Sequence, residues 1–135
     1  MFLGVISMGS HPKHEAIVNG FHSQFKAIFD TSKQGMYLYM DDTHKVCNKK
    51  FSDLLGFRSP QEFAKIKGSF LAALVDKKSQ HMVVVAYTKA VDHAECSTIP
   101  VTWKTKKGKK VSTQVTFVPV MYEDHAMALH FIEKS

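Results

Sequence analysis

Hydrophobic positions recur with helical spacing near the start of the chain and on alternate residues near its end. Between residues 12 and 29 the apolar side chains fall on one face of a helix. This stripe consists of Ile17, Val18, Phe21, Phe25, Ile28 and Phe29. Water is a poor environment for so wide a stripe. The pattern therefore predicts an amphipathic helix over residues 12–30 that is covered by the rest of the domain or by another chain.

Short elements fill the middle of the chain. Residues 36–40 and 45–47 are rich in strand-forming side chains, and the acidic turn Asp41-Asp42-Thr43 separates them. Helical segments are expected over residues 48–56, from Ser59 onward, over 69–75 and over 77–92. Asn48 and Ser59 are of the types that begin helices, and Gly56 is of the type that ends them.

Alternation returns in the last third. Apolar residues occupy every second position around Trp103, around Phe117 and around Leu129, which predicts three strands. The order is thus helix, two strands, several short helices and three strands. This order predicts an α+β domain with a largely antiparallel sheet.

The segment around Asn48 resembles the PAS domain family. In that family a strand begins at glycine and reaches an acidic turn, a short strand ends in Asn, and the next helix reads like N-x-x-F-x-x-L-L-G-[FY]. The matching positions here are Gly35, Asp41, Asn48, Phe51, Leu54, Leu55, Gly56 and Phe57. Ser59–Glu62 is similar to the family's next helix start, and Lys106–Lys109 to the tip of its closing hairpin. The turn after Asp41 departs from the family by its shortness and its lack of glycine.

The resemblance implies a five-stranded antiparallel sheet with short helices across one face, often with a cavity between them. Residues 31–135 would form this PAS core and residues 12–30 the amphipathic helix in front of it. Residues 1–11 are expected to be an N-terminal extension, either disordered or left from an expression tag. The family's usual roles are sensing a small molecule, a cofactor or light, and pairing with another PAS domain.

Composition agrees with a single domain. The 135 residues are 44% hydrophobic, which is enough for one core without disulfides or metal. The two cysteines lie far apart, which favours reduced thiols in a cytoplasmic protein. No apolar run reaches the roughly 20 residues of a membrane-spanning helix, so no membrane association is expected.

The net charge of +6 raises the question of nucleic-acid binding. The densest basic cluster, residues 104–110, brackets Gly108 between two predicted strands. Lysines in such a place are typical of a solvated hairpin turn. Nucleic acid is therefore not expected as a partner.

Chemistry-bearing residues are few. No nucleophile elbow, phosphate loop or paired carboxylates facing a histidine occur, so the chain is not expected to be an enzyme. His11, His14 and His22 have no acidic or cysteine partner nearby in sequence, and no metal site is expected. Cys47 lies in a predicted strand and is expected to be a small buried side chain.

Two cofactors follow from the resemblance. His93 lies near the register used by haem-binding PAS domains, with His81 as a second candidate. The arginines of those domains fall on Ile99 and Thr113, so the supporting residues are absent. Light-sensing relatives carry a cysteine where residues 68–72 have none, so flavin is not expected. The cofactor therefore stays open, with haem as a minority hypothesis.

Sensing and association remain as the main hypotheses. An apolar cavity would be lined by Met36, Leu38, Phe70, Met82, Tyr87, Trp103, Phe117 and Leu129, although the same residues could form a filled core. A homodimer would use the helix stripe and the outer sheet face, through Ile17, Val18, Phe21, Phe25, Ile28, Val118, Val120 and Ala128.

The favoured hypothesis is a stand-alone PAS sensor that binds a small apolar molecule and signals through homodimerisation or a partner such as a histidine kinase. No kinase, cyclase or DNA-binding segment is expected within the chain. The alternative is a ligand-free interaction module.

Overall fold

The computed structural model describes residues 11–135. Two helices, α2 (His11–Gln24) and α3 (Lys26–Thr31), precede strands β1 (Gly35–Asp41) and β2 (His44–Cys47). The helices α4 (Lys49–Leu54), α5 (Pro60–Ala64), α6 (Phe70–Leu74) and α7 (Lys77–His93) follow. Strands β3 (Ser97–Lys104), β4 (Lys110–Tyr122) and β5 (His125–Lys134) complete the chain. Apart from His11, which begins α2, the predicted extension at residues 1–11 lies outside the described residues.

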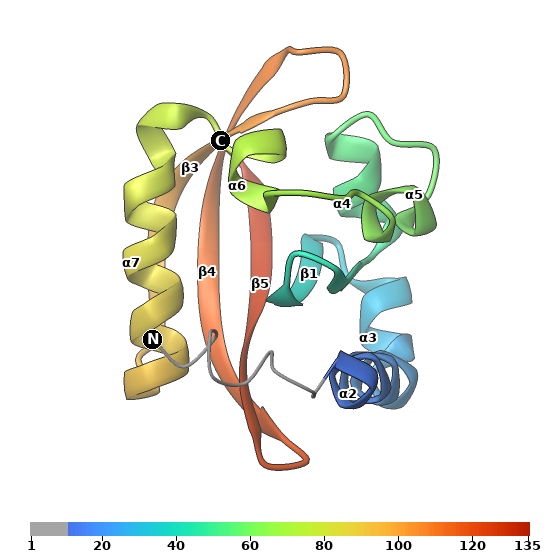
Figure 1. Cartoon of the computed structure of the whole chain (residues 1–135). Helices are drawn as coiled ribbons and strands as arrows, with labels where there is room; N and C mark the ends of the chain where they lie inside the picture. Colours follow the sequence, from blue (N-terminus) through green and yellow to red (C-terminus); the bar gives the residue numbers. More distant parts are fainter. Residues whose placement is uncertain (1–10) are drawn as a thin grey trace.

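The five strands form one antiparallel sheet in the order β2-β1-β5-β4-β3. The first and last strands in sequence are therefore neighbours at its centre, and Tyr37 pairs with His130. The β3–β4 and β4–β5 turns project from opposite ends of the sheet (Figure 1). The predicted α+β class and five-stranded antiparallel sheet are confirmed.

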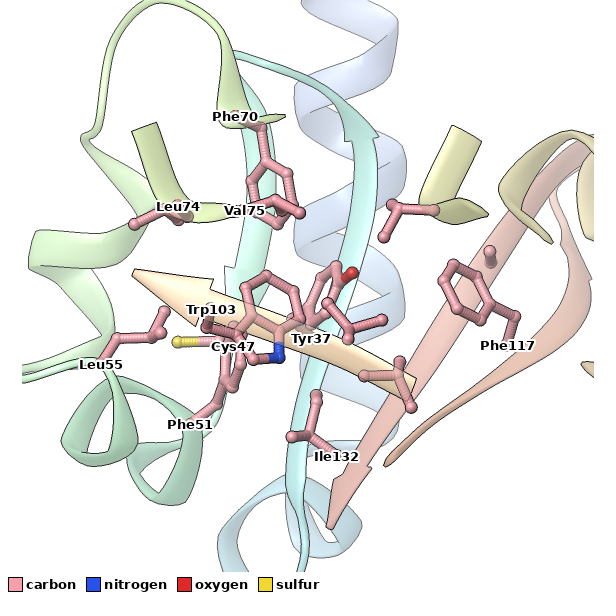
Figure 2. Close-up of a cluster of buried hydrophobic side chains, with 14 of the residues drawn as sticks. Tyr37, Cys47, Phe51, Leu55, Phe70, Leu74, Val75, Trp103, Phe117 and Ile132 are labelled. Atoms are coloured by element: carbon pink, nitrogen blue, oxygen red, sulfur yellow. The ribbon is translucent and has the colours of Figure 1, made fainter. Parts of the chain in front are cut away.

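The inner face of the sheet packs against α4 to α7 around a cluster of large aromatic side chains. Tyr37 lies against Phe51 with ring centroids 5.0 Å apart, and the Trp103 ring lies edge-on to both. In Figure 2 Tyr37 and Trp103 lie at the centre of the cluster, with Phe70 above them and Ile132 below. Burial of this much apolar surface is the main stabilising term of the fold.

The outer face of the sheet is covered by α2 and α3. Ile17, Val18, Phe21 and Phe29 are buried against Met36, Leu38, Met40 and Met127 of the sheet. Four of the six residues of the predicted amphipathic stripe are thus buried within one chain. The sheet therefore has apolar side chains on both faces, which explains the near-continuous apolar run in β1.

The predicted helix over residues 12–30 is in fact two helices. Phe25 has φ −105° and ψ 21°, outside the helical range, and separates α2 from α3. Helical hydrogen bonding continues across the break, from Phe25 N to Phe21 O and from Phe29 N to Phe25 O. The break leaves Phe29 buried and Ile28 49% exposed, so the stripe is not continuous.

Local signals in the sequence are well reproduced. The Asn48 and Ser59 side chains cap α4 and α5, and Gly56 follows α4 with φ +82°. Gly108 has φ +86° in the β3–β4 turn, as a turn glycine requires. The lysine cluster lies at this exposed turn, as predicted.

In the described part of the chain, no helix combines the length and the apolarity that crossing a bilayer requires.

Candidate ligand-binding site

A pocket of about 200 Å³ lies between α6, α7 and the inner face of the sheet. Its lining residues are mostly aromatic or aliphatic and come from β1, α6, α7 and β5. They are Tyr37, Tyr39, Phe70, Leu71, Val83, Val84, Tyr87, Thr88 and His130. Val84 is 44% exposed and stands where the pocket meets solvent. A concave apolar site with a few polar groups is the usual form of a small-molecule site.

His130 is a buried polar group of this lining. Its ring stacks on Tyr37 at a centroid distance of 3.8 Å and meets Phe117 edge-on at 4.7 Å. The Nδ1 atom lies 3.2 Å from the carbonyl oxygen of Tyr37. A carbonyl can only accept, so Nδ1 donates, and Nε2 of the neutral ring is an acceptor.

The pocket lining is electrically neutral. Burial lowers the pKa of His130 to about 3, although hydrogen bonds to the backbone oppose this shift. Burial likewise raises the pKa of Tyr37, Tyr39 and Tyr87 above their ordinary value, and the hydrogen bond to Asp42 adds to the effect at Tyr39. At neutral pH these groups carry no charge, so the pocket suits an uncharged molecule.

Asp42 fastens the end of β1 to the start of α6 beside the pocket. Its Oδ1 accepts hydrogen bonds from the Tyr39 hydroxyl, at 2.8 Å, and from the Phe70 backbone N–H, at 3.0 Å. The predicted acidic turn therefore also positions two residues of the pocket lining.

Only two of the predicted cavity residues line this pocket, Phe70 and Tyr87. Trp103 and Phe117 are fully buried in the filled core, where the indole N–H of Trp103 donates to Thr113 Oγ1 at 2.9 Å. The sequence analysis had allowed either a cavity lining or a filled core at these two positions, and the structure places both residues in the filled core.

The other predicted cavity residues were wrongly placed. Met36, Leu38 and Leu129 lie on the outer face of the sheet, under α2 and α3. Their neighbours Tyr37, Tyr39 and His130 face the pocket instead, because successive strand residues point to opposite faces. Met82 is 44% exposed on α7, where Val83 holds the inward position.

Half of the predicted dimer residues are buried within the chain. Ile17, Val18 and Phe21 pack from α2 against the outer face of the sheet, and Ala128 lies in the inner core with no exposed surface. These four residues are therefore not free surface: the sheet covers the first three, and the inner helices and strands cover Ala128. Phe25, Val118 and Val120 are half-buried, and Ile28 is exposed.

The predicted haem ligands do not reach the interior. His93 and His81 are both exposed on α7 and neither lines the pocket. A haem site at either position is therefore unsupported, since both side chains are exposed and lie outside the pocket lining. Cys47 is buried, as predicted, and burial raises the pKa of its thiol to about 12.

Sequence reasoning missed seven pocket residues: Tyr37, Tyr39, Leu71, Val83, Val84, Thr88 and His130. A usable signal was present in β1, where Tyr37 and Tyr39 alternate with Met36, Leu38 and Met40. The tyrosine face was the better choice for a site, since tyrosine carries a polar atom that needs a partner when buried. No local signal in the sequence identified His130 as a buried residue. It lies between Leu129 and Phe131, so the alternation placed it on the face opposite those two apolar side chains.

No protein-family model matches this chain, and no curated protein does. Solved structures match it at low sequence identity. The PAS domain of an HTR-like protein from Haloarcula marismortui is 16% identical, with 93% of this chain and 100% of that chain covered and a TM-score of 0.60. The PAS domain of a protein from Colwellia psychrerythraea is 18% identical, with coverage of 85% and 97% and a TM-score of 0.65.

A third match is the PAS domain of a LuxR-family transcriptional regulator from Burkholderia thailandensis, in complex with ethanol. It is 15% identical, with coverage of 82% and 96% and a TM-score of 0.61. Identities this low carry information about the fold alone. The agreement over nearly the whole length, together with the strand order and the helices across one face, shows that this chain has the fold of a PAS domain.

Proposed function

We propose that this chain is a PAS sensor domain that binds a small uncharged molecule in the pocket between α7 and the sheet. Its output passes to a second protein, either another copy of the chain or a signalling partner such as a histidine kinase. The observation that carries the proposal is the apolar pocket itself, with a neutral histidine in its lining.

The size of the pocket limits the ligand. About 200 Å³ is smaller than the pockets of drug-sized ligands. A dry cavity of about 150 Å³ is known to hold benzene, so a single ring or a short chain fits. A ligand with one hydroxyl or N–H group could donate to Nε2 of His130. The ethanol bound to the Burkholderia domain is a molecule of this class, which supports the proposal by analogy only.

The sheet offers a route from the pocket to α2. In β1 and β5 the pocket residues alternate with residues that pack under α2, and Tyr37 pairs with His130 just as Leu38 pairs with Leu129. A ligand that favours one arrangement of these strands would change how α2 docks, which is a shift between existing populations.

The direct test is native mass spectrometry of the freshly purified chain, followed by thermal-shift measurements with small neutral alcohols and phenols. We expect a non-covalent adduct or a ligand-dependent rise in the melting temperature. Val84→Trp, at the mouth of the pocket, should abolish this response. Val85→Trp is the matched control, since Val85 is its neighbour on α7, is 39% exposed and does not line the pocket.

A ligand-free interaction module is the second candidate. It is favoured by the large apolar side chains that remain exposed, which are Ile28 on α3, Met82, Val84 and Val85 on α7, and Met121 on β4. Blank mass spectra and no thermal response in the wild-type chain would reject the sensor. Self-association lost in Ile28→Asp would then favour the module.

A further inference from the structure

A cluster of two histidines and one aspartate joins α2 to the β1–β2 turn, on the side of the sheet away from the pocket. His14 Nδ1 lies 2.9 Å from Asp41 Oδ2, and His44 Nδ1 lies 2.7 Å from Asp41 Oδ1. One potential ligand atom from each residue lies within 4.8 Å of the other two. The carboxylate thus holds two imidazoles that come from distant parts of the sequence.

The cluster is shielded and preorganised. The side chains of His14, Asp41 and His44 are 2%, 20% and 14% exposed. Thr43 also donates to Asp41 Oδ1, from its backbone N–H at 2.9 Å and its hydroxyl at 3.0 Å. Burial opposes ionisation, yet the hydrogen bonds from His14, His44 and Thr43 lower the pKa of Asp41 to about 2. Asp41 is therefore an anion that several hydrogen-bond donors hold between the two histidines.

We propose that His14, Asp41 and His44 form a binding site for one divalent transition-metal ion of the Zn²⁺ type. Two imidazole nitrogens and a carboxylate oxygen suit Zn²⁺, Ni²⁺ or Cu²⁺ better than Mg²⁺ or Ca²⁺. Each neutral ring would bind the ion through Nδ1, with its proton moved to Nε2. The inference is independent of the ligand pocket.

Binding of an ion requires a local rearrangement. Zinc bonds of about 2.0–2.2 Å in a tetrahedron place neighbouring ligand atoms about 3.3–3.5 Å apart. The two imidazoles now contact different oxygens of Asp41, at 2.9 and 2.7 Å, so one of these oxygens would have to turn toward the ion while both rings move back from the carboxylate. Rotation of the Asp41 carboxylate and of the half-buried His44 ring could supply this movement.

The surroundings offer a fourth ligand and a way in. The ring of His125, the first residue of β5, has its centroid 5.9 Å from that of His14. A hollow of about 260 Å³ beside the cluster is lined by His44, Thr43 and Glu15, among others. Either His125 or a water from this hollow could complete a tetrahedral site. A bound ion would fasten the N-terminal part of α2 to the sheet, whereas Phe29 anchors α3 further along the chain.

Spacing along the sequence did not show this cluster. His14 was considered together with His11 and His22, which have no acidic or cysteine partner nearby in sequence, whereas in the fold its side chain is buried against Asp41. Its partners stand 27 and 30 residues away in sequence and meet it only because α2 crosses β1 and β2.

The test is isothermal titration calorimetry of the tag-free chain with ZnCl₂, together with thermal shift and the visible spectrum of the Co²⁺ form. We expect one ion per chain and a rise in melting temperature of about 5–10 °C at an ion concentration about 100 times Kd. Tetrahedral Co²⁺ should give intense visible absorption bands. His44→Gln should weaken binding roughly 100-fold or more, since loss of a mere supporting partner costs about 10–100-fold.

His81→Gln is the matched control, because it removes an exposed histidine of α7 far from the cluster and should leave binding unchanged. Asp41→Asn is a second variant, which keeps the side-chain shape. If His44→Gln and Asp41→Asn bind zinc as the wild type does, or if no saturable binding occurs, the proposal is wrong. The cluster would then serve only as a hydrogen-bonded link between α2 and the sheet.

Discussion

At the scale of single residues, buried polar side chains hold neighbouring elements of this fold together. Asn48 makes three such hydrogen bonds: it accepts from the backbone N–H of Met36 and of Phe51 and donates to the carbonyl of Gln34. It therefore caps α4 and joins that helix to the start of β1. The sequence predicted the cap, but the link to β1 depends on a non-local contact and could not be inferred from spacing.

Asn48→Ala is expected to destabilise the chain by about 2–4 kcal/mol, because the change removes a cap and leaves buried backbone groups unpaired. Ser59→Ala removes a cap with one side-chain hydrogen bond, from Glu62 N at 3.2 Å, and should cost only about 1 kcal/mol. Urea denaturation monitored by circular dichroism measures both. Equal losses in the two variants would show that the bonds to Met36 and Gln34 contribute little.

His130 makes stability depend on pH. Its pKa falls from 6.5 to about 3 on folding, so below pH 6.5 the unfolded chain binds a proton that the folded chain does not. The folded state is therefore progressively disfavoured between about pH 6.5 and 3. From pH 7.5 to pH 5 this residue alone should remove about 2 kcal/mol.

His130→Gln keeps a hydrogen-bond donor but cannot titrate in this range, so the variant should lose about 2 kcal/mol less than the wild type over that interval. Urea midpoints at pH 7.5 and 5 measure the difference. His81→Gln is the control for the substitution itself, because it makes the same chemical change at an exposed position of α7. An unchanged slope in His130→Gln would contradict a neutral buried ring.

At the scale of elements, the sequence predicted which strands form but not how their faces combine. Alternation assigns residues of one strand to two faces, yet both faces of this sheet are apolar. Phe117 was therefore grouped with Leu129, whereas the register pairs Phe117 with His130 and Val118 with Leu129. A shift of one residue in pairing exchanges the faces, and only the packing of both layers decides it.

The docking of α2 can be tested by truncating its side chains. Phe21 is 4% exposed. The centroid of its ring lies 4.6 Å from that of Phe25 and 5.6 Å from that of Tyr122. Phe21→Ala should lower the free energy of unfolding by about 3 kcal/mol, through lost burial and the cavity that remains. Ile28→Ala, at an exposed position of α3, should change it by less than about 0.5 kcal/mol. Similar values for the two would mean that α2 is not held against the sheet.

At the scale of the whole molecule, one sheet separates two apolar layers. The apolar pocket adjoins the inner layer. The outer layer is closed by α2, which Figure 1 shows on the other side of the sheet from α7. The sequence predicted this general plan through the order of its elements and the resemblance around Asn48. Pocket residues were harder to predict because β1, α6, α7 and β5 each supply a few, and only the tertiary arrangement brings them together.

The pocket on one face of the sheet and α2 on the other share the strands β1 and β5, so a change in the pocket should affect α2. A tryptophan at position 84 should fill the pocket and act as a tethered ligand against Tyr37 and His130. Because these strands also carry Leu38 and Leu129 under α2, restraining them should slow amide hydrogen exchange in α2 by about threefold or more. Val85→Trp adds the same side chain outside the pocket and should leave that exchange as in the wild type. Equal exchange in both variants would mean that occupancy of the pocket does not affect α2, which would contradict the proposed route through the sheet.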